Sequence, residues 1–165
     1  MKFIYRFILF TGFLVTSACT GVATIPEQTQ AQSHYADLKR SIPKHAQTLK
    51  VHIKHIRSLA GTMHAGLYDS TLKFPRRFGH LEAQEERVGE DSCTLVFKDV
   101  PYGRYAIAAF HDKNNDGILN TNFFGIPTEP IAFSNGAQAG SFGPPRFEEA
   151  VFEVKSEVTA IELSF

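Results

Sequence analysis

Apolar side chains recur at every second position from Leu49 onward, and this period constrains the fold more than any other feature of the chain. In the first run, Leu49, Val51 and Ile53 alternate with polar or charged neighbours. Successive side chains of a β-strand point to opposite faces, so the run predicts a strand with one buried face. Similar runs predict about seven strands in all, at residues 49–54, 62–68, 81–88, 93–97, 104–111, 150–154 and 158–165.

Two of these runs indicate where their strands lie in a sheet. Residues 104–111 are apolar on both faces, which is typical of a central strand, whereas residues 81–88 are polar and predict an edge strand. No amphipathic run of a dozen residues follows residue 48, which argues against an α/β fold. We therefore predict an all-β domain over residues 49–165, an antiparallel β-sandwich of immunoglobulin-like layout with one long ordered loop.

The first residues have the three parts of a bacterial secretory signal. Lys2 and Arg6 supply a positive start, an apolar run follows at 7–15, and small residues precede Cys19. The apolar run is too short for a membrane span, which needs roughly 20 residues. A buried N-terminal helix is the alternative, but it explains neither the positive start nor the small residues. We predict a signal peptide over residues 1–19 and export of the protein.

Cys19 decides whether the exported protein stays on a membrane. Residues 15–19 resemble a bacterial lipobox, in which the cysteine becomes the lipidated N-terminus, although Thr16 stands where leucine is usual. Cleavage after Ala18 or Ala23, followed by release into the periplasm, is the alternative. The expected location is therefore the periplasm or, for a lipoprotein, the outer membrane.

Residues 20–48 are predicted as a polar tether between the signal and the domain. Within the tether, a short helix is expected at 35–42, because Pro43 cannot continue it. If Cys19 carries lipid, Cys93 has no partner for an intramolecular disulfide. After ordinary cleavage, a bridge between the two cysteines remains an alternative.

Residues 112–122 combine oxygen-bearing side chains with a glycine in a pattern typical of a Ca²⁺ loop. The candidate ligands occupy offsets 1, 3, 5 and 9, with a carbonyl at offset 7: Asp112, Asn114, Asp116, Asn120 and the carbonyl of Ile118. The run resembles the first nine positions of an EF-hand loop, but Phe123 replaces the bidentate glutamate of position 12. We therefore expect weak Ca²⁺ binding, typical of extracellular modules. The alternative is an Asx-rich turn closed by its own hydrogen bonds.

Residues 123–149 are rich in aromatic residues, proline and glycine, and contain no predicted strand. Long irregular segments in compact domains are usually functional or disordered, and apolar residues every few positions argue against disorder. We predict an ordered flap whose tip is Asn135 and which is pinned by Phe124, Ile126, Phe133, Phe142 and Phe147. The candidate ligand contacts beside it are His111, Asn135 and Arg146. A lid that only covers an open sheet edge is the alternative.

The charge balance and the absent motifs argue against several function classes. Lys plus Arg and Asp plus Glu both number 17, so no basic excess is available to neutralise nucleic-acid phosphates. The chain has no G-x-S-x-G, no H-E-x-x-H and no phosphate-binding glycine loop. The spacing of the seven His provides no third ligand for zinc or copper. An enzyme is therefore disfavoured.

Three long segments carry a distinctive combination of residues: YAIAAFHD at 105–112, NFFGIP at 122–127 and FGPPRFE at 142–148. Together with LYD at 67–69 and FSN at 133–135, they resemble one bacterial family of exported proteins, the domain-of-unknown-function family 2141. The similarity covers residues 49–165 and departs from the family pattern at 129–132. The resemblance implies an exported β-sandwich of the prealbumin-like kind, and it implies no catalytic residue.

These observations favour a non-catalytic binding or structural module of the cell envelope, stabilised by Ca²⁺. Its partner would be an unidentified envelope component, and its membrane contact the predicted lipid anchor at Cys19. The first alternative is a periplasmic hydrolase acting at the loop region 111–149, with His111 and Asp112 as an acid–base pair in an open pocket. The second is a protein that offers its edge strand at 81–88 to another chain.

Overall fold

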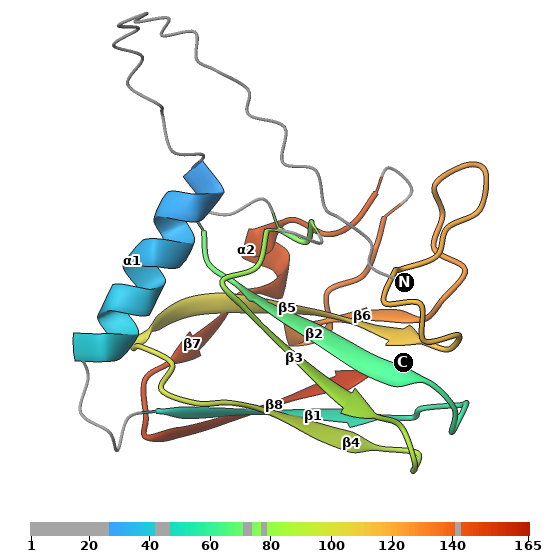
Figure 1. Ribbon diagram of the computed structural model, residues 1–165, viewed down its shortest axis with the longest axis horizontal. Coiled ribbons are helices and arrows are strands. Elements are labelled where there is room, and N and C mark those ends of the chain that lie inside the picture. Colours follow the sequence, from blue (N-terminus) through green and yellow to red (C-terminus); the bar gives the residue numbers. More distant parts are fainter. Residues whose placement is uncertain (1–26, 42–46, 71–73, 77–78, 141–142) are drawn as a thin grey trace, which may run out of the picture.

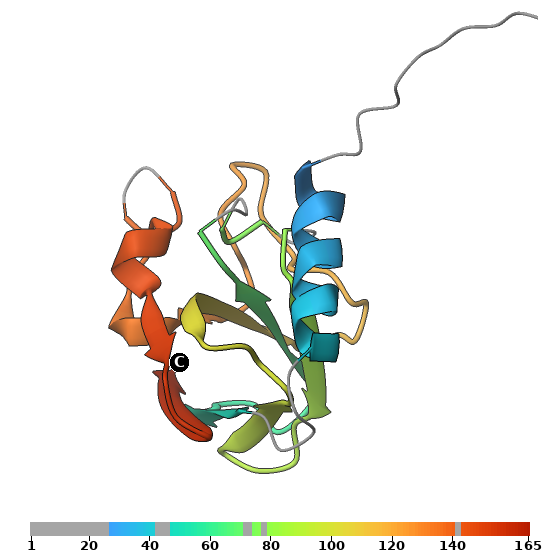
Figure 2. The same ribbon diagram turned by 90° about the vertical axis from the view of Figure 1, so that its left-hand side faces the viewer.

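The chain forms two facing β-sheets with a helix packed against their side (Figures 1 and 2). The computed structural model describes residues 27–41, 47–70, 74–76, 79–140 and 143–165. The three-stranded sheet has the order β4-β1-β8, with bounds β1 (Thr48–Lys54), β4 (Cys93–Phe97) and β8 (Val158–Ser164). The five-stranded sheet has the order β3-β2-β5-β6, with β7 also paired to β5; the bounds are β2 (Thr62–Tyr68), β3 (Glu82–Arg87), β5 (Gly103–Asp112), β6 (Ile131–Phe133) and β7 (Phe152–Val154). This mostly-β, open sandwich-like arrangement agrees with the predicted fold class.

The core lies between the two sheets, where the alternating side chains were predicted to meet. Leu49, Val51 and Ile53 of β1 are completely buried, whereas Lys50 between them is exposed. From the other sheet, Ile107 of β5 is equally buried in the same cluster. Burying such side chains stabilises the fold by about 1.5–3 kcal/mol each, which explains why the period-two pattern determines the faces of the strands.

The central and edge positions predicted from the two runs are both confirmed. β5 pairs with β2, β6 and β7, and residues on both of its faces are buried, including Ile107 and Ala106. β3 lies at the edge of the same sheet, and its side chains are mostly exposed. β5 is therefore a central strand, and it determines where the loop that follows it begins.

The sheet is not purely antiparallel, which corrects the predicted layout. β1 pairs antiparallel with β4 but parallel with β8, in a register from Thr48 opposite Val158 to Lys54 opposite Ser164. β8 comes directly after β7, which belongs to the other sheet, so the chain crosses between sheets before it joins β1. Alternation predicts which face of a strand is buried, but it contains no information on the direction of its neighbour.

The flap predicted without a strand contains one, which raises the number of strands to eight within the described residues. β6 is only three residues long, so it is too short to show a period, and it pairs with residues 108–110 of β5. The same segment also holds the one-turn elements η1 (Ser134–Gly136) and α2 (Phe147–Ala150). Whether so short a segment forms a strand depends on the neighbouring strand that it pairs with, and not on its own sequence.

Residues 27–41 form a helix, α1 (Glu27–Ser41), where a polar tether over 20–48 and a shorter helix had been predicted. The helix lies beside β3 (Figure 2). Tyr35 is 6% exposed and joins the core, while its hydroxyl and the Lys39 ammonium both reach the Glu82 carboxylate, at 3.3 and 2.6 Å. Only one large apolar residue of the helix is buried, so its sequence lacks an amphipathic stripe. Among the described helices, none is long and apolar enough to cross a membrane.

Candidate functional site: the loop between β5 and β6

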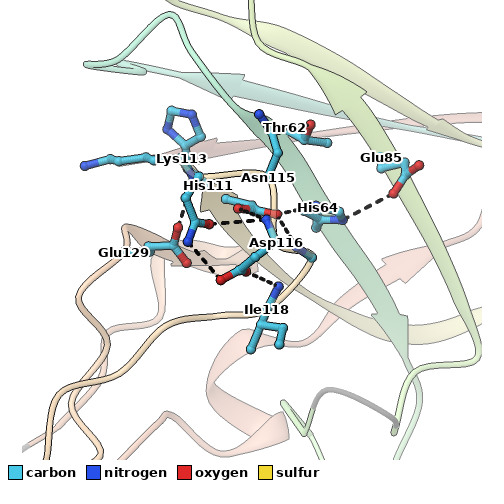
Figure 3. A network of polar contacts seen from close by, with 12 residues as sticks. Thr62, His64, Glu85, His111, Lys113, Asn115, Asp116, Ile118 and Glu129 are labelled. Carbon is cyan, nitrogen blue, oxygen red and sulfur yellow. Dashed lines mark hydrogen bonds and ion pairs between the residues drawn. The ribbon is translucent and has the colours of Figure 1, made fainter.

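The loop that follows β5 starts from two buried residues and returns beside them. His111 and Asp112, the last residues of β5, are 2% and 1% exposed. The backbone N–H of His111 donates to the carbonyl of Pro130 at 3.0 Å, so the loop closes where it began. Figure 3 shows the polar contacts that gather at this point. The long insertion at 113–130 is therefore held at its base by the centre of the sheet.

Asp112 closes the first turn of the loop. Its Oδ2 accepts a hydrogen bond from the backbone N–H of Gly117 at 2.7 Å, and its Oδ1 accepts one from that of Asp116 at 3.3 Å. Gly117 has φ = 71°, a left-handed conformation that glycine adopts without steric cost. Within the loop, the backbone N–H groups of Asp116 and Ile118 donate to Oδ1 of Asn114 and of Asp116, each two residues earlier, at 3.3 and 2.8 Å. These are the Asx-turn contacts that the sequence allowed as an alternative, and we call residues 112–120 the Asx turn.

The four side chains predicted as cation ligands come together in this turn. The amide nitrogen of Asn114 donates to Oδ2 of Asp116 at 2.8 Å and to Oδ1 of Asn120 at 3.0 Å. The amide nitrogen of Asn120 donates to the same Asp116 oxygen at 2.9 Å. Turning either amide by 180° would exchange nitrogen for oxygen at these positions, which is the donor atom Ca²⁺ requires. The cluster can therefore exist either as a hydrogen-bonded turn or as an oxygen cage.

Ile118 contributes to the cluster through its backbone N–H, which donates to Oδ1 of Asp116 at 2.8 Å. Its side chain is 47% exposed. Within the described residues, no group of three or more His, Cys, Asp and Glu side chains is close enough to hold a metal ion. Any cation here would depend on amide and carbonyl oxygens beside the two aspartates.

Glu129 is a member of this polar cluster that the sequence analysis missed. It is 8% exposed, and its two carboxylate oxygens accept hydrogen bonds from the backbone N–H groups of Lys113 and Asn120, at 2.9 and 3.0 Å. It thus connects both ends of the Asx turn from the segment that leads into β6 (Figure 3). The sequence did contain one sign that could have drawn attention to it, because Glu129 is the one charged residue between Asp116 and Arg146.

His64 of β2 connects the loop to the edge of the sheet. Its ring stacks on Phe110, with centroids 4.8 Å apart, and its nitrogens lie 3.4 Å from Asp112 Oδ2 and 3.4 Å from Glu85 Oε2. Because His64 lies between two carboxylates, one of its ring nitrogens can donate a hydrogen bond to the buried Asp112. Strand register explains these contacts of His64, because it places His64 opposite both Phe110 and Glu85.

The hydrolase alternative required His111 and Asp112 in an open pocket, and the structure contradicts that arrangement. Nε2 of His111 donates to the carbonyl of Ala60 at 2.7 Å, and both side chains are buried. An open groove of about 560 Å³ lies elsewhere and is lined by residues of β1, β6, η1 and β8, with neither His111 nor Asp112 among them. The half-buried Cys93 is no better candidate, because burial and the nearby Glu86 raise the pKa of its thiol.

Asn135 and Arg146, the other candidate ligand contacts, lie apart from His111. Both meet Glu149: the Asn135 amide donates to its carbonyl oxygen at 3.2 Å, and the Arg146 backbone N–H donates to its carboxylate at 2.6 Å. The Arg146 side chain is 81% exposed. The three residues therefore do not form one site, since His111 is enclosed at the end of β5.

The predicted pins of the flap divide into two groups. Phe133 and Phe147 are buried and pack with Phe74, with ring centroids 5.9 and 6.3 Å from it. Phe124 and Ile126 are 81% and 59% exposed, so their prediction as pins is wrong. The sequence pattern could not separate the groups, because apolar spacing indicates order without indicating burial. Phe142 and the predicted lipidation site Cys19 lie outside the described residues.

Residues 121–127 form a small hydrogen-bonded hairpin, which we call the aromatic hairpin. Thr121 and Pro127 are bridged, and Oδ1 of Asn122 accepts hydrogen bonds from the backbone N–H groups of Phe124 and Ile126, at 2.9 and 3.0 Å. At its tip Phe123 is 97% exposed, with its ring 5.5 Å from that of Phe124. The loop therefore holds aromatic side chains in water on an ordered backbone.

Comparison with known proteins places the chain among bacterial sequences. Residues 51–162, more than half of the chain, match the family described as "Uncharacterized protein conserved in bacteria (DUF2141)". Searches of curated proteins and of solved structures gave no match. The match confirms the resemblance drawn from the segments at 105–112 and 122–127.

Proposed function

We propose that this chain, which belongs to the bacterial family DUF2141, is a non-catalytic binding module of the cell envelope that presents the aromatic hairpin to a partner. Export is supported by the signal-like residues 1–19, and membrane attachment by the lipobox-like cysteine at position 19. A prealbumin-like sandwich is the fold we propose for the two-sheet arrangement. The buried positions of His111 and Asp112 favour binding over catalysis.

The exposure of the aromatic hairpin is the observation on which the binding function depends. Of the eight large apolar side chains exposed in the described part of the chain, four lie between residues 118 and 126. Scattered apolar residues are normal on a protein surface, but a group of them marks an interaction site. Their backbone is ordered by hydrogen bonds, so binding requires little further loss of conformational entropy.

Ca²⁺ is the cation we propose for the Asx turn, in a stabilising role. Support comes from the mutual contacts of the Asn114, Asp116 and Asn120 side chains, and from Asp112, whose carboxylate accepts a backbone hydrogen bond in the same turn. Two carboxylates and two amides form a weakly charged ligand set, consistent with low affinity. Since the turn continues directly into the aromatic hairpin, an ion here would stiffen the base of the presented surface.

Thermal unfolding with Ca²⁺ and with chelator tests the cation. We expect about 10 mM Ca²⁺ to raise the melting temperature by about 4–6 °C, because a ligand at ten times its Kd adds about 1.4 kcal/mol. The increase should disappear in Asp116→Asn and persist in Glu157→Gln, which removes an exposed acid outside the loop. Equal melting of the wild-type protein in Ca²⁺, Mg²⁺ and chelator would reject Ca²⁺ and leave the hydrogen-bonded turn.

A further inference from the structure

We propose that the tip of the aromatic hairpin inserts into the surface of the lipid bilayer to which Cys19 anchors the chain. The proposal rests on the export and lipidation proposed above, and adds a second membrane contact made by the folded domain itself. It assigns a role to Phe123, Phe124 and Ile126, whose side chains are exposed although the backbone that carries them is ordered.

The side chains at the tip have the chemistry of a bilayer interface. Phe123 and Phe124 are 97% and 81% exposed, and Ile126 beside them is 59% exposed. Aromatic and aliphatic side chains of this kind gain free energy when they move from water into the boundary between headgroups and acyl chains. Two adjacent phenylalanines on one turn would enter that boundary together.

At the tip, backbone N–H groups are already hydrogen-bonded within the hairpin, which lowers the cost of moving them to a less polar environment. The N–H groups of Phe124 and Ile126 donate to Oδ1 of Asn122, and that of Gly125 donates to the Asn122 carbonyl at 2.9 Å. Pro127 has no N–H to satisfy. Moving an unpaired backbone donor out of water is costly, and at these positions the donors are already paired within the hairpin.

The hairpin carries no charge that would oppose insertion. No Asp, Glu, Lys or Arg occurs from residue 117 to residue 128. Acidic groups near the tip would be repelled by anionic lipids, and any charged group would have to be desolvated. An uncharged tip should therefore enter both zwitterionic and anionic membranes.

The hairpin and the N-terminal end of α1 lie on the same side of the described chain. In Figures 1 and 2, which differ by a turn about the vertical axis, the hairpin and the first turn of α1 both reach the upper side of the described chain, although Figure 1 shows them at opposite ends of its horizontal axis. Cys19 precedes Glu27 by eight positions, which an extended chain spans in at most about 29 Å. A bilayer that holds Cys19 is thus within reach of the side that presents the hairpin.

A narrow tip suits a bilayer better than a second protein. A stable protein–protein interface buries about 800 Å² on each partner, with polar groups around an apolar centre. The hairpin is a projecting turn (Figure 1), and its apolar residues are confined to 123–126. Such a shape offers little area to a partner surface, whereas lipids close around it.

Single-tryptophan fluorescence tests the insertion, since the chain contains no Trp. Phe123→Trp would be made in the full chain, purified after its natural processing and reconstituted in vesicles of phosphatidylcholine, with or without phosphatidylglycerol. We expect a blue-shifted emission and quenching by brominated acyl chains. The control is Tyr102→Trp, because Tyr102 is 59% exposed and comes directly before β5, at the opposite end of the strand from the hairpin. It should show neither effect.

A second measurement removes the anchor so that the hairpin acts alone. In the chain without the predicted signal residues 1–18 and with Cys19→Ser, adding Phe123→Ser and Phe124→Ser should weaken co-sedimentation with vesicles by at least about tenfold. The matched control changes Tyr102 and Val158 to Ser, two exposed apolar residues elsewhere, and should bind as before. Circular dichroism of each variant checks that the sheets remain folded.

The outcomes separate this inference from the proposed function. Absence of quenching for Phe123→Trp in a lipidated, Ca²⁺-responsive protein would overturn insertion and leave the envelope module intact. A blue shift without vesicles, dependent on protein concentration, would overturn it in favour of self-association. Binding to anionic vesicles alone would overturn it in favour of electrostatic adsorption. Quenching with a mass spectrum that shows no lipid on Cys19 would retain the insertion and reject the anchor.

Discussion

Glu129 shows how one carboxylate can organise a long loop. Both of its oxygens accept backbone hydrogen bonds, from Lys113 at the beginning of the Asx turn and from Asn120 at its end. Hydrogen bonds to an ionised acceptor contribute about 1.5–3 kcal/mol, more than bonds between neutral groups. A buried charge is tolerated here because these donors replace the water it loses.

Glu129→Ala should therefore destabilise the protein by about 2–4 kcal/mol, since two backbone donors lose their partner. Urea unfolding would measure the loss. Limited proteolysis should show that cleavage within 113–128 becomes faster than cleavage elsewhere. Glu157→Ala, which removes an exposed carboxylate, is the control and should change stability by less than about 0.5 kcal/mol. A Glu129→Ala variant as stable as this control would contradict the fastening role.

At the level of single residues, the sequence predicted those site members that are close together along the chain. Asp112, Asn114, Asp116 and Asn120 were found because one turn brings alternate positions to one point. Glu129 and His64 were missed because a chain return and a strand register bring them to that point. Such partners become identifiable only after the pairing of β5 with its neighbours is known.

At the level of elements, the sequence predicted those strands whose buried faces follow one period. β1, β2, β4 and β5 were predicted within one or two residues of their ends. β6 was missed because three residues show no period, and most of α1 because a single buried residue, Tyr35, leaves no apolar stripe. The parallel pairing of β8 was missed because strand direction depends on how the chain crosses between the sheets.

The contact of α1 with the sandwich should depend on Tyr35. Truncation by Tyr35→Ala is expected to cost about 2–4 kcal/mol in the free energy of unfolding, the usual loss for a large buried side chain. Leu38→Ala is the matched control, because Leu38 is an apolar residue of the same helix that is 39% exposed. Denaturant titrations of both variants would measure their free energies of unfolding. Equal losses would mean that α1 does not contribute its tyrosine to the core.

At the level of the whole molecule, buried tyrosines make the fold sensitive to alkali. Burial raises the pKa of Tyr68 to about 12, and burial together with Asp69 raises that of Tyr105 to about 12, from an ordinary value of 10.0. Burial and the Glu82 carboxylate also raise the pKa of Tyr35. Between the ordinary and the raised values, the unfolded chain releases protons that the folded chain retains, so the folded state loses stability as pH rises.

We expect the free energy of unfolding to fall between pH 10 and pH 12, by on the order of 2 kcal/mol for each such tyrosine. Below pH 10 these groups are protonated in both states and contribute no slope. Tyr105→Phe loses the hydrogen bond to Pro101 and should be less stable at pH 8 by about 1 kcal/mol, but its alkaline loss should be smaller. Urea midpoints across this pH range, with the exposed Tyr102→Phe as control, provide the measurement. An unchanged alkaline slope in Tyr105→Phe would contradict the assignment.

The parallel pairing of β1 with β8 also determines how the domain resists mechanical force. The two strands run side by side over seven register pairs, from Thr48 opposite Val158 to Lys54 opposite Ser164. Tension applied to the chain before β1 and after β8 pulls the strands past each other along their length. The bonds of the ladder are then loaded together in shear rather than opened one at a time, so the two strands separate only when many of these bonds break at once.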